Sequence, residues 1–311
     1  MEDFLSVVFD DLHLKGAGYV FVHGHANWSA QVALPGRAVF HALLFAEVYL
    51  HTHEQTYHLR AGDLFVLPSG LAHTLSDASQ SPQTPESISY ALSERRHQPY
   101  ALGKGDISSI VLIAGSHYDT DLGQPLMSAL PSAFLVAGQD QEPPEWLRIG
   151  ILFLQQEIRE SRPGQQSILN RLGDIWFMQC LRVYIDKIST DDSSWLRALK
   201  DPALATVLSA VHRKPEQEWT VPKMAELAHL SRSAFADRFQ RTMGKPPQRY
   251  LNEHRMRLAA WQLRHSDQPV CRIADMTGYA SETAFGQAFK RAHGMAPGRY
   301  RQHIRSQCAV N

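Results

Sequence analysis

The sequence predicts an α+β protein with an amino-terminal antiparallel β-barrel, connecting helices and a carboxy-terminal all-α domain with two helix-turn-helix motifs. Three observations lead to this prediction: a stretch near the carboxyl end that occurs twice, opposite net charges in the two halves, and a series of short strand-like segments in the first 120 residues. We place the expected boundaries at residues 1–125, 126–200 and 201–311.

The repeated stretch aligns residues 224–250 with residues 273–300. The matching positions include Met224 with Ile273, Phe235 with Phe285, Phe239 with Phe289, Gly244 with Gly294, Pro247 with Pro297 and Tyr250 with Tyr300. A repeat this dense indicates one structural unit built twice. A single copy could be an ordinary helical hairpin, but two copies in register are much harder to explain in that way.

Each copy predicts a helix, a tight turn and a second helix. Serine is the expected N-cap of the second helix in both copies, and glycine ends it; Thr220 caps the first helix of the first copy. Phenylalanines spaced at i and i+4 define the buried face of each second helix. The helix that joins the copies, from about residue 247 to residue 266, spans roughly 28 Å.

Charge separates the two halves of a chain that is neutral overall. Residues 212–311 contain 17 Lys and Arg but 8 Asp and Glu, so residues 1–211 contain 14 and 23 of the chain's 31 of each. A basic excess that coincides with the repeat is typical of nucleic-acid-binding domains. In a helix-turn-helix the second helix enters the major groove, and a spacing of roughly 28 Å suits successive groove faces about 34 Å apart.

The helical face opposite the phenylalanines identifies the candidate DNA-binding residues, which are Arg232, Ser233, Ala236, Asp237, Gln240 and Arg241 in the first copy and Glu282, Thr283, Gln287, Lys290 and Arg291 in the second. Base edges require donors and acceptors, which favours Arg232, Ser233, Gln240, Thr283 and Gln287 for base contacts. The residues expected to contact phosphates are Arg238, Arg241, Lys290, Arg291 and Arg299. Asp237 and Glu282 either accept from a cytosine amine or orient an arginine.

In the amino-terminal part, short segments that alternate apolar and polar residues predict strands at residues 19–22, 28–33, 39–45, 47–52, 55–59, 63–67, 73–76 and 109–115. The spacing of Gly62, Pro68, Gly70 and His73 resembles the second motif of the cupin barrel. The first motif is incomplete, because Leu43 stands where a second histidine is expected after His41. The resemblance implies a barrel whose histidines point inward.

His41, Glu47 and His73 are the candidate effector-pocket residues, and His41 and His73 are also candidate ligands of a divalent metal. The three share a site if no turn or bulge separates His41 from Glu47. The alternative is that the two histidines form hydrogen bonds inside the barrel. We expect a loop at residues 76–99, helices near residues 146–160 and 166–188, and a flexible joint at residues 191–194.

Taken together, the motifs resemble the AraC family of transcription regulators, and in particular its cupin-bearing branch. In the helical domain the resemblance rests on residues 231–235, 255–256, 278–281 and 289–291; in the first half it rests on residues 40–41, 61–63, 67–68, 72–73, 126–131 and 146–147. The resemblance implies a regulator that binds double-stranded DNA and is controlled by a small-molecule effector or by dimerisation through its cupin domain. The implied partners are RNA polymerase and a second copy of the chain in a homodimer.

The composition indicates a cytoplasmic protein without a membrane partner. We find no secretory leader and no apolar run of about 18 residues. Cys180, Cys271 and Cys308 show no paired spacing, and Ala114 stands where some relatives carry a cysteine for sensing oxidants. The chain lacks signatures of nucleophilic catalysis, so we expect no enzyme. The alternative is a cupin metalloenzyme, an oxygenase or isomerase, fused to a DNA-binding tail.

Overall fold

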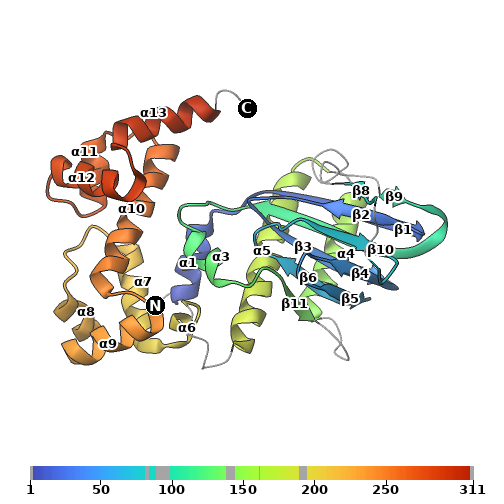
Figure 1. Ribbon diagram of the computed structural model, residues 1–311, viewed down its shortest axis with the longest axis horizontal. Helices are drawn as coiled ribbons and strands as arrows, with labels where there is room; N and C mark the ends of the chain where they lie inside the picture. Colours follow the sequence, from blue (N-terminus) through green and yellow to red (C-terminus); the bar gives the residue numbers. More distant parts are fainter. Residues whose placement is uncertain are drawn as a thin grey trace. The chain divides into compact units, whose positions relative to one another are not determined.

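The computed structural model describes residues 3–80, 84–88, 99–137, 144–160, 162–188 and 195–308 (Figure 1). The contacts divide the chain into two compact units. The β unit consists of His13–Tyr118 and Leu130–Lys187, and the helical unit consists of Met1–Leu12, Asp119–Ala129 and Ile188–Asn311. The expected joint at residues 191–194 and much of the expected loop at residues 76–99 lie outside the described residues.

The β unit contains two sheets. The six-stranded sheet has the order β11-β6-β3-β10-β1-β9, with bounds β1 Lys15–Ala26, β3 Arg37–Phe45, β6 Leu64–Leu67, β9 Tyr100–Leu102, β10 Lys104–His117 and β11 Phe134–Ala137. The five-stranded sheet has the order β5-β4-β7-β2-β8, with bounds β2 Ser29–Val32, β4 Glu47–His51, β5 Thr56–Arg60, β7 His73–Ser76 and β8 Glu86–Ser87.

The expected antiparallel barrel is wrong in two respects. Strand β9 pairs with β1, and β8 pairs with β2, in parallel. In the described part of the chain each sheet also ends in two different edge strands, so the barrel does not close. Apolar–polar alternation shows that a segment is a strand and which face is buried, but it does not specify the neighbouring strand. The two parallel strands are short segments that the pattern did not reveal.

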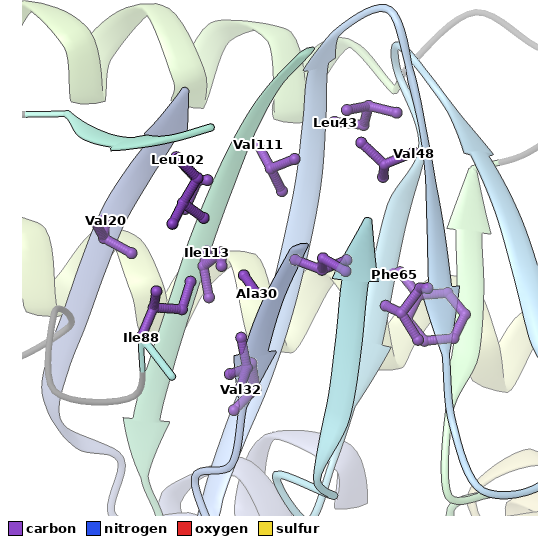
Figure 2. Packing of buried hydrophobic residues seen from close by; sticks show 14 of the residues in the cluster. Val20, Ala30, Val32, Leu43, Val48, Phe65, Ile88, Leu102, Val111 and Ile113 are labelled. Atoms are coloured by element: carbon purple, nitrogen blue, oxygen red, sulfur yellow. The ribbon is translucent and has the colours of Figure 1, made fainter. Parts of the chain in front are cut away.

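The core of the β unit is an apolar cluster to which both sheets contribute (Figure 2). It includes Val20, Leu43, Phe65, Val111 and Ile113 from the six-stranded sheet and Ala30, Val32 and Val48 from the other. The opposite face of β3 is also buried, because Phe40 packs edge-on against Trp176 at a centroid distance of 5.4 Å. Trp176 belongs to α5 (Gln165–Lys187), which packs on α4 (Glu145–Glu160). Both faces of β3 are therefore buried along most of its length.

The helical unit contains the repeat and two segments from the first half of the chain. Its helices are α1 Phe4–Leu12, α3 Gln124–Ala129, α6 Arg197–Lys200, α7 Pro202–Arg213, α8 Val221–Leu227, α9 Arg232–Met243, α10 Pro247–His265, α11 Val270–Met276, α12 Glu282–His293 and α13 Pro297–Cys308. The sequence analysis missed α1, which packs on α7. Among the described residues, we find no helix with the length and apolar character needed to cross a membrane.

Candidate DNA-binding helices and the buried histidine pair

Two helix pairs in the helical unit share the same local structure. The first pair is α8 and α9, and the second pair is α11 and α12. In both, a backbone N–H after the turn donates to an alanine carbonyl of the first helix, from Leu230 to Ala225 at 2.9 Å and from Tyr279 to Ala274 at 3.0 Å. Equivalent residues therefore make equivalent hydrogen bonds, as the repeat predicted.

The predicted caps are confirmed in both helix pairs. The Ser231 and Ser281 side chains accept hydrogen bonds from the N–H groups of Ala234 and Ala284, each at 3.2 Å. Gly244 and Gly294 end the second helices in the left-handed conformation, with φ of 69° and 77°. Glycine adopts this conformation without the steric cost that a Cβ adds.

The predicted buried faces are confirmed as well. Phe235, Phe239, Phe285 and Phe289 are fully buried. Phe239 packs edge-on against Tyr250 at 5.7 Å between centroids, and Phe289 packs in the same way against Tyr300 at 5.3 Å. This packing fixes the rotation of α9 and α12 about their axes, so the opposite faces point outward.

The outward faces contain the eleven residues expected to bind DNA. Ten of them are exposed and Ala236 is half-buried: Arg232, Ser233, Asp237, Gln240 and Arg241 on α9, and Glu282, Thr283, Gln287, Lys290 and Arg291 on α12, with Glu282 and Thr283 in the first turn. Asp237 pairs with Arg241 at 3.0 Å. Between the two roles considered for Asp237, this contact favours orientation of an arginine.

Arg238 has a partner inside the helical unit. Its Nε donates to Asp201 at 2.6 Å. Asp201 also caps α7 by accepting from the N–H groups of Ala203 and Leu204. The carboxylate thus joins α7 to α9 through Arg238, a structural contact that the sequence analysis did not predict.

Acidic side chains from the first half of the chain are connected to both copies of the repeat through basic side chains. His212 lies between Asp11 of α1, at 2.9 Å from Nδ1, and the Tyr250 hydroxyl, at 2.7 Å from Nε2. Arg264 lies 2.7 Å from Asp121 and 3.4 Å from the Tyr300 hydroxyl. The two tyrosines occupy equivalent repeat positions, so each half of the repeat is connected to an acidic residue through a basic side chain.

Asp11, His212 and His254 bring three potential metal-ligand atoms within 4.8 Å of one another. The rings of His212 and His254 stack with centroids 3.8 Å apart and an interplanar angle of 28°. Nitrogen lone pairs lie in the ring planes, so stacked rings direct them side by side rather than toward one ion. Both nitrogens of His212 also have hydrogen-bond partners. We therefore interpret this cluster as an anchor for α1.

In the β unit, His41 of β3 and His73 of β7 form a pair between the two sheets. Their Nε2 atoms are 2.7 Å apart, and both side chains are buried. His73 Nδ1 lies 2.6 Å from the Leu71 carbonyl oxygen, which can only accept, so Nδ1 carries the proton. In neutral His73 the Nε2 atom is then the acceptor and His41 Nε2 is the donor.

This arrangement leaves His41 Nδ1 as an acceptor. It is buried and has no hydrogen-bond partner among the described residues. Burial, and secondarily the nearby His73, hold the pKa of His41 well below its usual value. Burial also lowers the pKa of His73 to about 4. The pair is therefore neutral near pH 7.

Glu47 does not join the histidines. Ala46 has φ of 62°, which separates β3 from β4 by a tight turn and breaks the alternation assumed for a shared face. The Glu47 side chain is 60% exposed and contacts His58 Nε2 at 2.8 Å. The site therefore has two imidazoles in place of the three donors expected. Catalytic metal sites usually provide three protein ligands and structural sites four, so the donor set does not fit a resident divalent ion.

Comparisons with known proteins agree with the organisation of the chain. Residues 3–186 match the family described as Cupin, and residues 224–303 match the Helix-turn-helix domain. The HTH-type transcriptional regulator AlkR of Acinetobacter baylyi (strain ATCC 33305 / BD413 / ADP1) is 35% identical over 305 residues, which cover 96% of this chain and 99% of that protein.

Two further relatives extend the comparison. A putative AraC-like transcription regulator of Streptomyces lividans is 30% identical over 306 residues, covering 97% of this chain and 98% of the relative. The RCS-specific HTH-type transcriptional activator RclR of Escherichia coli (strain K12) is 29% identical over 252 residues, which cover 81% of this chain and 79% of that protein. The chain belongs to the AraC family of helix-turn-helix transcription regulators and carries an amino-terminal cupin domain. It is a DNA-binding regulator of transcription.

We expect the buried histidine pair to make the folded protein less stable in acid. Below pH 6.5 the unfolded chain binds a proton at His73 that the folded protein does not bind until about pH 4. The free energy of unfolding should therefore fall as the pH decreases through this window. In urea titrations of the β unit, the decrease from pH 6.5 to 5 should be larger in the wild type than in a His41→Leu, His73→Leu double variant by about 1.5 kcal/mol or more.

A His53→Gln variant is the matched control for this titration, because the His53 side chain is 66% exposed. It should keep the wild-type pH dependence. Equal pH dependence in the wild type and the double variant would show that the buried pair does not control stability in acid.

Proposed function

We propose that both helix pairs are helix-turn-helix motifs, and that α9 and α12 enter successive turns of the major groove of one DNA duplex. The supporting observation is the equivalence of the two pairs in turn hydrogen bonds, caps and buried aromatic contacts. The 19-residue helix α10 joins them. One chain then makes the paired groove contacts that helix-turn-helix proteins usually make as dimers.

Within this proposal the exposed residues of α9 and α12 divide into two roles. Arg232, Ser233 and Gln240 of α9 contact base edges, as do Thr283 and Gln287 of α12. Arg241, Lys290 and Arg291 contact phosphates and position the protein. Asp237 holds Arg241 through their ion pair. Glu282 remains available to accept from a cytosine amine.

The cupin domain senses a small-molecule effector in this proposal, and the histidine pair is the polar position that such a molecule contacts. The pair lies inside an otherwise apolar core, and His41 Nδ1 is an acceptor without a partner among the described residues. A ligand that supplies an O–H or N–H donor there relieves the cost of an unsatisfied buried group, about 1–3 kcal/mol. The regulator acts on promoters in the cytoplasm, together with RNA polymerase.

Single alanine variants test the base contacts. Arg232→Ala and Gln287→Ala should each reduce discrimination against one mismatched base pair by about 1–3 kcal/mol, because each loses a base-edge hydrogen-bonding group. The measurement is binding of the full-length protein to a duplex selected from a random library, and to its single-base variants, at fixed salt.

Arg171→Ala is the control for this measurement, because Arg171 is an exposed arginine of α5 in the β unit, with a side chain that is 83% exposed. It should bind as the wild type does. Unchanged base preference in both alanine variants would rule out the assigned base contacts.

The α4 and α5 helices support a homodimer as part of the proposed function. They expose five large apolar side chains: Ile149, Leu152 and Phe153 on α4, and Ile168 and Ile175 on α5, each between 39% and 62% exposed. A symmetric dimer requires one patch that is complementary to itself, and an apolar patch satisfies this requirement. A group of large apolar side chains exposed on two packed helices is typical of protein interfaces.

Added charge should therefore dissociate the dimer. We expect the wild type to sediment with the mass of two chains, and a Leu152→Lys, Ile175→Lys variant with the mass of one, because the lysines would have to be desolvated in the interface. Gln155→Lys, which adds charge at an exposed position of α4 outside the stripe formed by Ile149, Leu152 and Phe153, should remain a dimer. A monomeric wild type, or a dimeric double variant, would contradict this interface.

The alternative function, a metal-dependent cupin oxygenase or isomerase with a DNA-binding tail, requires a metal at the histidine pair. Two donors do not fit such a centre, so we expect the metal content of the wild type and of the His41→Leu, His73→Leu variant to be equal. Elemental mass spectrometry of protein purified without a histidine tag measures this. Near-stoichiometric metal that disappears in the variant would support the enzyme.

A further inference from the structure

Arg255 lies within α10, the helix that joins the two proposed motifs. Its guanidinium group is directed toward the loop that precedes the first motif. Its Nε donates to the Pro215 carbonyl and its Nη2 donates to the Gln217 carbonyl, each at 2.8 Å. These two carbonyls belong to the segment between α7 and α8. A planar guanidinium can make two such directed hydrogen bonds at once, whereas an ammonium group acts as a single point charge.

The same guanidinium contacts the turn of the second helix pair. Its central carbon is 6.0 Å from the centroid of the Tyr279 ring, which is within the range of a cation–π contact. Tyr279 follows Gly278, the left-handed residue of that turn, with φ of 75°. The ring of Tyr279 also packs edge-on against Phe285 of α12, with centroids 5.7 Å apart.

The surroundings of Gly278 show how closely Arg255, the loop before the first helix pair and the turn of the second pair pack together. A Cβ at this position would lie 2.5 Å from Arg255 Nη2 and 2.8 Å from the Glu216 carbonyl oxygen. The turn of the second pair therefore packs against both Arg255 and the loop that leads into the first pair. A side chain at position 278 could be accommodated only if the guanidinium or the loop moved.

We propose that Arg255 is a positioning residue that fixes the orientation of the two helix-turn-helix motifs relative to each other and thereby sets the half-site spacing that the protein accepts on DNA. This inference rests on the proposed two-motif function. The first motif packs on α10 through Phe239 and Tyr250. In the second motif Phe289 packs on Tyr300 of α13, and α11 and α12 contact α10. Arg255 adds a contact common to both, because one guanidinium group bonds the loop before the first motif and touches the turn of the second.

The contrasting interpretation is that Arg255 only stabilises the loop at residues 214–218. In that case its loss would weaken binding to every duplex by the same factor. A positioning role predicts a different result, because two linked contacts gain affinity only when their geometry allows both to form. The dependence of affinity on half-site spacing therefore separates the two interpretations.

The test uses the full-length protein and a duplex that the wild type selects from a random library. Affinity is measured for this duplex, for versions with one base pair added or removed between the half-sites, and for each half-site alone. We expect wild-type affinity to fall about tenfold when one base pair is inserted, because both motifs can no longer dock together. Arg255→Met should bind the selected duplex about tenfold more weakly than the wild type does. Insertion of one base pair, which defines the spacing penalty, should weaken its binding further by only about threefold or less. Half-site affinities should be unchanged.

Three further variants test what the Arg255 side chain contributes. Arg255→Lys keeps the charge but not the two directed hydrogen bonds, so it should behave as Arg255→Met does. Arg249→Met removes the same charge from an exposed position of α10 that pairs with Glu253, and it should keep the wild-type spacing preference. Gly278→Ala should reproduce the relaxed spacing, because its methyl group displaces the guanidinium.

A uniform loss of affinity in Arg255→Met and Arg255→Lys, with the wild-type spacing penalty retained, would overturn the positioning role. Selection of a single half-site by the wild type would instead overturn the two-motif proposal. The two failures are therefore distinguishable. Thermal unfolding of each variant identifies any that is not folded, and Arg255→Lys remains informative if Arg255→Met does not fold.

Discussion

The helical unit depends on one packing constraint that is applied twice, the burial of two phenylalanines of a helix against the tyrosine that follows them. Phe235 packs on Phe239, which packs on Tyr250. In the same way Phe285 packs on Phe289, which packs on Tyr300. With 3.6 residues per turn, burying positions i and i+4 determines which positions remain outside. The polar faces of α9 and α12 are therefore consequences of the core, and their side chains can vary with the DNA sequence without changing the fold.

Local chemistry explains why this half was predictable from the sequence. A serine cap, a glycine in the left-handed conformation and a phenylalanine spacing each act within one helical turn, so the residues that cause the structure are neighbours in the chain. The ion pair of Arg238 was not predicted, because its partner Asp201 lies 37 positions away. The exposed face could be predicted from periodicity, but the internal ion pair could not.

The β unit shows the limit of the same reasoning. Most strands of the two sheets follow the predicted segments, because alternation is also a local property. The parallel pairing of β8 and β9 depends on long-range contacts that alternation does not specify. The position of Glu47 depends on the turn at Ala46, which interrupts the alternation between β3 and β4. His41 and His73 were correctly expected to point inward. Their mutual hydrogen bond agrees with the alternative of histidines hydrogen-bonded inside the domain, but the sequence did not show that the two would bond each other.

The place of α1 in the helical unit has a consequence for how the protein is made. Asp11 and its partner His212 are separated by 201 positions, and the tyrosine that completes this contact comes later still. At about 5–20 residues per second, the ribosome needs roughly 10–40 s to reach that partner after α1 has been synthesised. During this time the apolar face of α1, with Phe4, Val7, Val8 and Leu12, has no native surface to cover it. Helix α1 is thus synthesised long before its native contacts can form, and the helical unit is completed only after Tyr250 has been added.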